Sequence, residues 1–189
     1  MRLNGRVLAA AAVVLTAVVV AAGVLVARDT GPAQPTVTPV SNPTPAPSSA
    51  GGGDGGVIDV SGSDVLTGET VSLAAFRGKP VVINIWASWC PGCNAEARAL
   101  GEFAESHPEA GFVGINFQDS KDAARGFYDE YGWTFPSVFD PDGRIALSLG
   151  LQGTPTTIFL DSRHREAARI VGETDEQGFA DGLAAATRS

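Results

Sequence analysis

Residues 85–96, Ile-Trp-Ala-Ser-Trp-Cys-Pro-Gly-Cys-Asn-Ala-Glu, contain both cysteines of this 189-residue chain. The preceding run, Pro80–Ala87, is almost continuously apolar and rich in β-branched residues, which is typical of a central strand buried on both faces. Pro91 then stands where its missing N–H costs nothing, at the first position of a helix that we expect to end at Ser106. Cys90 is therefore predicted at the N-cap of that helix.

Three interpretations of Cys90 and Cys93 compete. As a structural crosslink the pair closes a loop of about four residues, which removes only about 2 kcal/mol of unfolded-state entropy. As a metal site, including a Cu(I) carrier, it supplies two ligands where structural zinc takes four. His107 and His164, the only histidines, are expected to be solvated turn residues rather than further ligands.

Redox chemistry is the interpretation that the spacing favours. At the N-cap, Cys90 would lie beside free backbone N–H groups and the positive end of the helix dipole. Such surroundings lower a thiol pKa from about 8.5 into a range of about 3.5–7.5. We expect an exposed, activated Cys90 that attacks and a shielded Cys93 that resolves, with no metal and no cofactor.

Glu96 lies on the same predicted helix face as Cys93, one turn further on. Cys93, Glu96, Leu100 and Phe103 recur at a helical spacing and predict an inward face that carries one carboxylate. A half-buried acid there would have a raised pKa and could exchange protons with Cys93. The alternative is an ordinary, partly exposed glutamate.

The rest of the domain alternates strand and helix patterns. Their order, βαβαββα with extra N-terminal strands, predicts an α/β sandwich around a mixed sheet. Pro155 precedes a predicted strand, and its peptide bond with Thr154 can be cis or trans on the sequence alone. Strands are expected at Val57–Val60, Gly68–Leu73, Pro80–Ala87, Gly111–Asn116, Thr156–Leu160 and Ala167–Val171, and helices at Pro91–Ser106, Ser120–Tyr131 and Asp175–Thr187.

The N-terminal part divides into three segments. Residues 7–27 form an uncharged apolar run that is long enough for a transmembrane signal-anchor, about 31 Å as a helix. Arg2 and Arg6 precede it, which places residues 1–6 in the cytoplasm and the rest of the chain outside. A cleaved signal peptide, which would give a secreted protein, is the alternative. Residues 28–56 contain six of the twelve prolines and predict a disordered linker to a domain at 57–189.

Charge argues against one class of partner. Residues 57–189 contain 10 Lys and Arg against 19 Asp and Glu, a net charge of −9. Phosphate binding needs a basic surface, so nucleic acid is not expected as a partner.

These motifs resemble the thioredoxin fold and, more closely, its exported, membrane-anchored TlpA/ResA/DsbE-like branch. Trp-Cys-x-x-Cys after a buried strand is the most specific of them, and the resemblance spans about residues 57–175. The matching stretches are Val71–Lys79, Val82–Cys90, Glu96, Gly114–Asn116 and Gly153–Thr156.

The resemblance implies a thiol–disulfide oxidoreductase of the bacterial cytoplasmic membrane. Cys90 would form a mixed disulfide with an exported client, and Cys93 would resolve it. Trp89 and Thr154 would contact the client beside a cis Pro155, and Glu96 matches the acid that this branch carries. A membrane thiol protein would donate or accept the electrons.

The sequence does not decide whether the protein reduces or oxidises its clients. The resemblance favours a reductase of exported proteins, for example in cytochrome c maturation, and an oxidase that forms disulfides is the alternative. Thiol peroxidase chemistry is a weaker one, because it needs a Thr-x-x-Cys turn and the chain has Ala87-Ser-Trp-Cys90. Two departures from the family pattern affect the site: Gly92 stands where proline usually precedes the second cysteine, and Arg98 replaces a proline after Glu96.

Overall fold

The computed structural model describes residues 56–189. The predicted cytoplasmic N-terminus, 1–6, and signal-anchor, 7–27, lie outside the described residues, as does all but the last residue of the predicted linker, 28–56. Within 56–189, no helix combines the length and the apolar character needed to cross a membrane.

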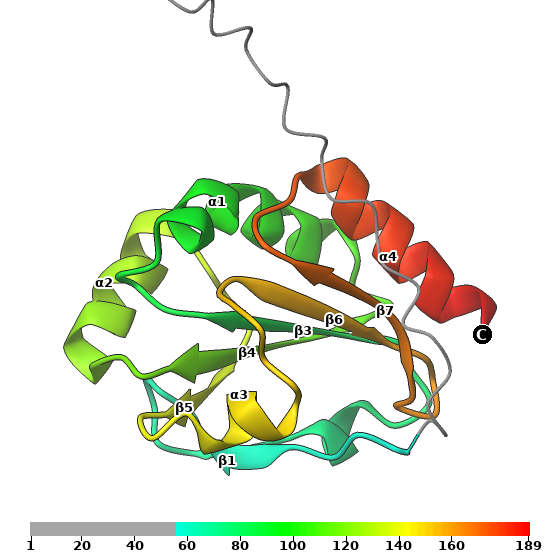
Figure 1. The fold of residues 1–189 in the computed structure, drawn as a ribbon, viewed down its shortest axis with the longest axis horizontal. Coiled ribbons are helices and arrows are strands. Elements are labelled where there is room, and N and C mark those ends of the chain that lie inside the picture. Colours follow the sequence, from blue (N-terminus) through cyan, green and yellow to red (C-terminus); the bar gives the residue numbers. More distant parts are fainter. Residues whose placement is uncertain (1–55) are drawn as a thin grey trace, which may run out of the picture. The chain divides into compact units, whose positions relative to one another are not determined.

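Twelve elements follow one another in the described part (Figure 1). In chain order they are β1 (Ser61–Ser63), β2 (Thr70–Ser72), the 3-10 helix η1 (Leu73–Phe76), β3 (Val81–Trp86), α1 (Pro91–Ser106), β4 (Gly111–Phe117), α2 (Lys121–Tyr131), β5 (Ser137–Asp140), α3 (Arg144–Ser148), β6 (Thr156–Leu160), β7 (Glu166–Val171) and α4 (Glu176–Arg188).

Five strands form a mixed sheet in the order β5-β4-β3-β6-β7, with β3 in the centre. β3 runs parallel to β4 and antiparallel to β6. All six residues of β3 are buried, as the apolar run predicted. β1 and β2 form a separate antiparallel pair. The predicted α/β sandwich around a mixed sheet is confirmed.

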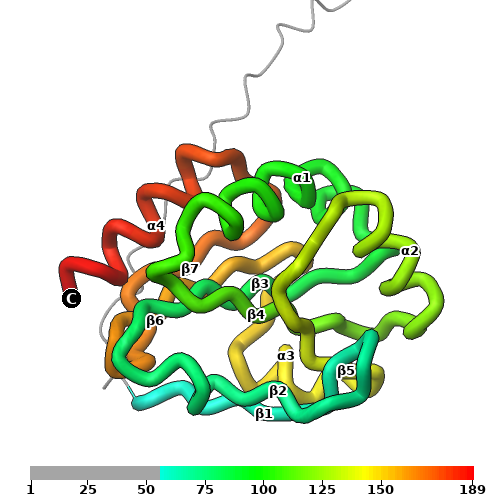
Figure 2. Tube along the Cα trace, turned by 180° about the vertical axis from the view of Figure 1, so that it is seen from behind, coloured from blue at the N-terminus to red at the C-terminus, as the bar shows by residue number. Residues whose placement is uncertain are grey.

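The two faces of the sheet have separate cores. Helices α1, α2 and α4 cover one face, and α3 with η1, β1 and β2 covers the other (Figure 2). Successive side chains of β3 point to opposite faces of the sheet. Val82 and Trp86 face the three helices, while Ile83 and Ile85 face the opposite side. Asn84, between Val82 and Trp86 in this alternation, is a polar side chain directed toward α1.

The expected strand at Val57–Val60 is wrong, because its backbone bonds to the β6–β7 turn and to η1: Ile58 N–H donates to the His164 carbonyl, and Leu73 N–H donates to the Val60 carbonyl. Four elements were not predicted, namely β1, η1, β5 and α3. With three to five residues each, they are too short for hydrophobic periodicity to mark them.

The prediction that both histidines are solvated is wrong for His164. Only 5% of His164 is exposed, because the segment before β1 and η1 close over the β6–β7 turn. Its backbone has a positive φ of 60°, and Asp161 accepts the N–H groups on both sides of it. His107, partly exposed at the end of α1, stacks on Phe103 with ring centroids 3.9 Å apart.

Gly182 and Gly126 give a matched stability prediction. Both lie inside helices, but a Cβ on Gly182 in α4 would meet the ring of the fully buried Phe159, whereas a Cβ on Gly126 in α2 would meet nothing within 4 Å. We expect Gly182→Ala to lower the free energy of unfolding by about 1–3 kcal/mol through overpacking. Gly126→Ala should raise it by about 0.5–1 kcal/mol, since alanine is the better helix former. Urea unfolding of both variants would check this; a stabilised Gly182→Ala would contradict it.

Candidate active site

Cys90 is at the N-cap of α1, as predicted, and is joined to Cys93 by a disulfide. The two Cα atoms are 5.2 Å apart. Pro91 occupies the first helical position, and the Cys93 N–H donates to Cys90 Sγ at 3.2 Å. The helix therefore places one of its unpaired backbone donors on the first sulfur, where it would also stabilise a thiolate.

The expected difference in exposure between the two cysteines is wrong. Cys90 is 2% exposed and Cys93 is 1% exposed, and both belong to the core beneath the three helices. Trp89 takes the exposed position instead, with 56% of its surface accessible. The sequence pattern could not show this, because the core that contains Cys90 also includes residues far along the chain, among them Phe159 and Phe179.

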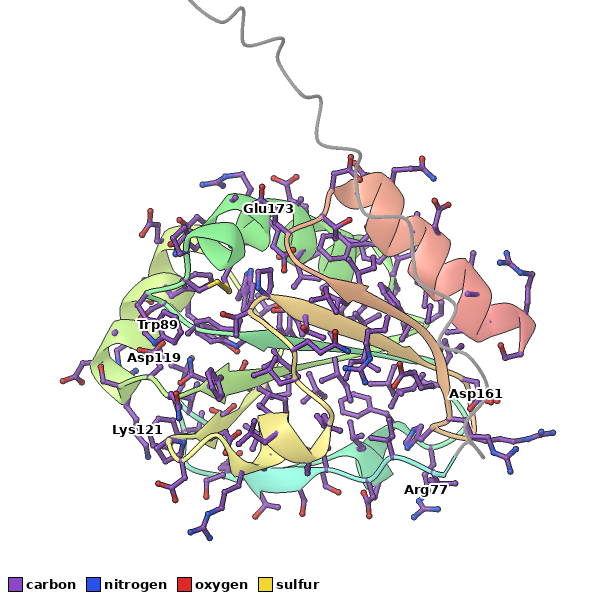
Figure 3. All side chains as sticks on the ribbon, viewed as in Figure 1. Arg77, Trp89, Asp119, Lys121, Asp161 and Glu173 are labelled. Atoms are coloured by element: carbon purple, nitrogen blue, oxygen red, sulfur yellow. A yellow bond between two sulfur atoms is a disulfide. The ribbon has the colours of Figure 1, made fainter. Side chains whose placement is uncertain are left out.

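Trp89 is held at the rim of this site. Its indole N–H donates to the Gln118 carbonyl at 3.0 Å, and its ring centroid lies 6.5 Å from that of Phe117. In Figure 3, Trp89 and Asp119 lie at the same end of the domain as the disulfide, and Asp161 and Arg77 lie at the opposite end.

Asp119 fixes the loop before Cys90, a role that the sequence analysis missed. Its carboxylate accepts the Ser88 N–H at 2.7 Å and the Ser88 hydroxyl at 2.9 Å, together with bonds from Asn116 and Ser120. A signal was available: Asp119 follows β4, which is parallel to β3, and the carboxyl ends of parallel neighbours meet at one edge of a sheet.

Pro155 lies opposite the cysteine turn. The Thr154–Pro155 peptide bond is cis, the isomer that the resemblance implied. A Cβ placed on Gly92 would be 3.0 Å from Pro155 Cδ, so the turn and the proline are in contact distance. Pro155 is buried, and Thr154 beside it is partly exposed. The structure thus brings Cys90, Cys93 and Pro155 together with Thr154 at the same edge.

Glu96 is more buried than expected, at 2% exposed. Asn84 Nδ2 donates to its Oε1 at 2.9 Å, and the Thr174 N–H donates to its Oε2 at 3.0 Å. Burial raises the pKa of Glu96 to about 8, although the Asn84 and Thr174 hydrogen bonds oppose the rise and the nearby Glu173 adds to it slightly. The carboxyl therefore holds its proton at neutral pH, and Arg98 in place of a proline has not exposed it.

The Asn84 amide can serve either protonation state of Glu96. Its Nδ2 donates both to Glu96 and to the Thr157 hydroxyl at 3.0 Å, while its Oδ1 is buried with no partner. A turned amide would present that oxygen to a protonated Glu96, whose O–H is a donor. That oxygen is the acceptor that a protonated Glu96 would need, and in the geometry seen here the amide instead donates to Glu96.

No group of three or more His, Cys, Asp or Glu side chains that could hold a metal occurs within residues 56–189.

Sequence comparison finds one matching family. The family model for Redoxin matches residues 47–184. Among curated proteins, the chain is 32% identical over 118 residues to the thiol:disulfide interchange protein DsbE of Vibrio cholerae and 38% identical over 113 residues to that of Escherichia coli K12. These alignments cover 62% and 57% of this chain but only 63% and 55% of the relatives, so the chain matches less than two thirds of their length.

Solved structures with the same fold come from several bacteria. A DsbF homologue from Corynebacterium diphtheriae has a TM-score of 0.67 and 33% identity, covering 78% of this chain and 95% of that one. A secreted disulfide oxidoreductase from Mycobacterium tuberculosis, homologous to DsbE of E. coli, has a TM-score of 0.61 and 26% identity, covering 67% and 95%.

Proposed function

The chain belongs to the redoxin family, and from this premise we propose that it is a thiol–disulfide oxidoreductase acting on exported proteins. The observation that supports this most directly is the Cys90–Cys93 disulfide at a helix N-cap, facing a cis-proline. A bond between neighbours on one helical turn adds little stability. Its position beside a backbone donor suits a bond that opens and closes.

In the reducing direction, the dithiol form would act in two exchanges. The Cys90 thiolate attacks one sulfur of a client disulfide, forms a mixed disulfide and displaces the other client sulfur as a thiolate. Cys93, deprotonated, then attacks Cys90 Sγ and displaces the second client thiolate. The client gains two electrons and two protons, and the protein ends in the disulfide form seen here.

Glu96 is proposed as the group that exchanges a proton with Cys93. It lies three residues after Cys93 on the same buried face of α1. A pKa of about 8 lets it release or take up a proton near neutral pH.

Two side chains beside the cysteine turn are proposed to contact the client next to Pro155. They are Trp89, which is largely exposed, and Thr154, which is partly exposed.

The proposed setting is outside the bacterial cytoplasmic membrane. The apolar segment 7–27 would anchor the chain, with 1–6 inside and 28–56 as a linker to the domain at 57–189. Cleavage of this segment would give a secreted protein instead. A membrane thiol protein would recharge the dithiol, and the clients would include proteins of cytochrome c maturation, as the resemblance to the TlpA/ResA/DsbE-like branch implies.

Redox titration of the Cys90–Cys93 pair against dithiothreitol or glutathione tests the function and its direction. We expect a potential below about −220 mV, which suits a reductase. A value near −120 mV would instead support the oxidase alternative. A disulfide that never exchanges with a dithiol would refute both.

A further inference from the structure

Glu173 brings a second carboxylate to the rim of the site. It lies in the connection between β7 and α4 and is exposed. A Cβ on Gly92 would be 3.2 Å from Glu173 Oε2 and 3.0 Å from Pro155 Cδ. The carboxylate therefore lies over the cysteine turn, beside the cis-proline.

No part of the described fold neutralises this charge. Within residues 56–189, two ion pairs form, between Arg144 and Asp142 and between Arg169 and Glu166, and Glu173 takes part in neither. Its side chain also makes no hydrogen bond to any other described residue. Glu96, with a pKa of about 8, is mostly neutral at pH 7. Glu173 is thus a carboxylate at the cysteine turn that forms no ion pair within the described domain.

We propose that Glu173 selects clients that carry a basic residue beside the reacting cysteine. This rests on the proposed function, because a polypeptide joined to Cys90 has to cross the turn at Gly92 and the cis-proline. The residues next to its cysteine then pass the Glu173 carboxylate. A lysine or arginine there gains an ion pair, and an acidic residue meets a like charge.

The size of the effect follows from the exposure of Glu173. Exposed ion pairs are weak, and a pair at this rim should change a rate constant about two- to fivefold. Overall charge is a separate influence: the net charge of −9 on residues 57–189 attracts any basic peptide from a distance. A test has to separate the local carboxylate from that general field.

The experiment uses one disulfide-bonded decapeptide in three forms, with arginine, glutamine or glutamate on both sides of each cysteine. The reduced domain is mixed with each peptide at low salt, and the rate constants are divided by those for dithiothreitol, which removes differences in the peptides' own reactivity. We expect Glu173→Gln to lower the arginine-to-glutamate rate ratio about two- to fivefold and Glu173→Lys to lower it further.

Glu176→Gln is the matched control, since it removes one exposed carboxylate in the first turn of α4 and leaves Glu173 in place. An unchanged ratio in this variant supports the proposal. An equal fall in both glutamine variants, or none in Glu173→Gln, would overturn the Glu173 proposal alone. If the wild type does not reduce even the glutamine peptide, the proposed function fails and the Glu173 proposal fails with it.

Discussion

Cys93→Ser is expected to stop turnover and to leave clients joined covalently to Cys90. Serine cannot attack the mixed disulfide, so the second exchange has no nucleophile, while the N–H of residue 93 still donates to Cys90 Sγ. We expect steady-state reduction of a disulfide substrate to fall at least about 10³-fold. Non-reducing gels and mass spectrometry should show a one-to-one adduct that dithiothreitol releases.

Cys90→Ser is the matching control. It should be as inactive as Cys93→Ser but form no adduct, because the N-cap sulfur is the one that attacks. Both variants should remain folded, since the crosslink closes a loop of about four residues and contributes about 2 kcal/mol at most by its effect on the unfolded chain. Adducts on Cys93 in the Cys90→Ser variant, at a comparable rate, would reverse the proposed roles.

Glu96→Gln should slow the opening of the Cys90–Cys93 disulfide about 10²-fold at neutral pH. When a reductant attacks Cys90, Cys93 leaves as a thiolate, and the protonated Glu96 is the proposed donor. The ratio of wild-type to variant rate should be constant well below pH 8 and fall toward one as the pH rises through about 8, the pKa of Glu96. Stopped-flow reduction by dithiothreitol from pH 6 to 10 measures this ratio, in which the reagent's own ionisation cancels.

The same variant should change how stability depends on pH. The folded pKa of Glu96 is raised from 4.5 to about 8, so the folded state retains a proton that the unfolded state loses. The contribution of this proton to the free energy of unfolding is fully present below pH 4.5 and is lost as the pH rises to about 8. Its total size is on the order of 4 to 5 kcal/mol. Glu96→Gln should lack this component in urea unfolding at pH 5, 7 and 9.

Glu102→Gln is a suitable control for both measurements, because Glu102 is an exposed glutamate on the same helix. It should match the wild type in rate and in pH dependence. A Glu96→Gln protein that matches the wild type in both would remove the proton-exchange role.

Hydrophobic pattern and local chemistry predicted the elements that carry the dithiol. The apolar run before Cys90 became the central strand β3, and Pro91 with the inward stripe gave α1 its predicted bounds. Glu96 was predicted to be half-buried and is almost fully enclosed. Short-range pattern was sufficient here because each of these features depends on residues within a few turns of chain.

Features that depend on distant segments were not predictable in the same way. The burial of Cys90 and the hydrogen bond from Thr174 to Glu96 come from parts of the chain that only the sheet order brings together. Val57–Val60 looked like a strand by composition, but its backbone bonds to the hairpin turn and to η1 rather than to a ladder. Glu173 has no sequence pattern that links it to Gly92, 81 positions earlier.

The residues of the site are synthesised in a fixed order, and the cysteines come first. Ribosomes build chains from the N-terminus, so Cys90 and Cys93 exist before Pro155, Thr174 and α4 have been joined to them. A nascent chain at that stage has two ordinary thiols next to an unfinished sheet, without the proline wall and without the second hydrogen bond to Glu96. The chemistry proposed for the dithiol therefore belongs to the finished domain, and partly synthesised chains would lack it.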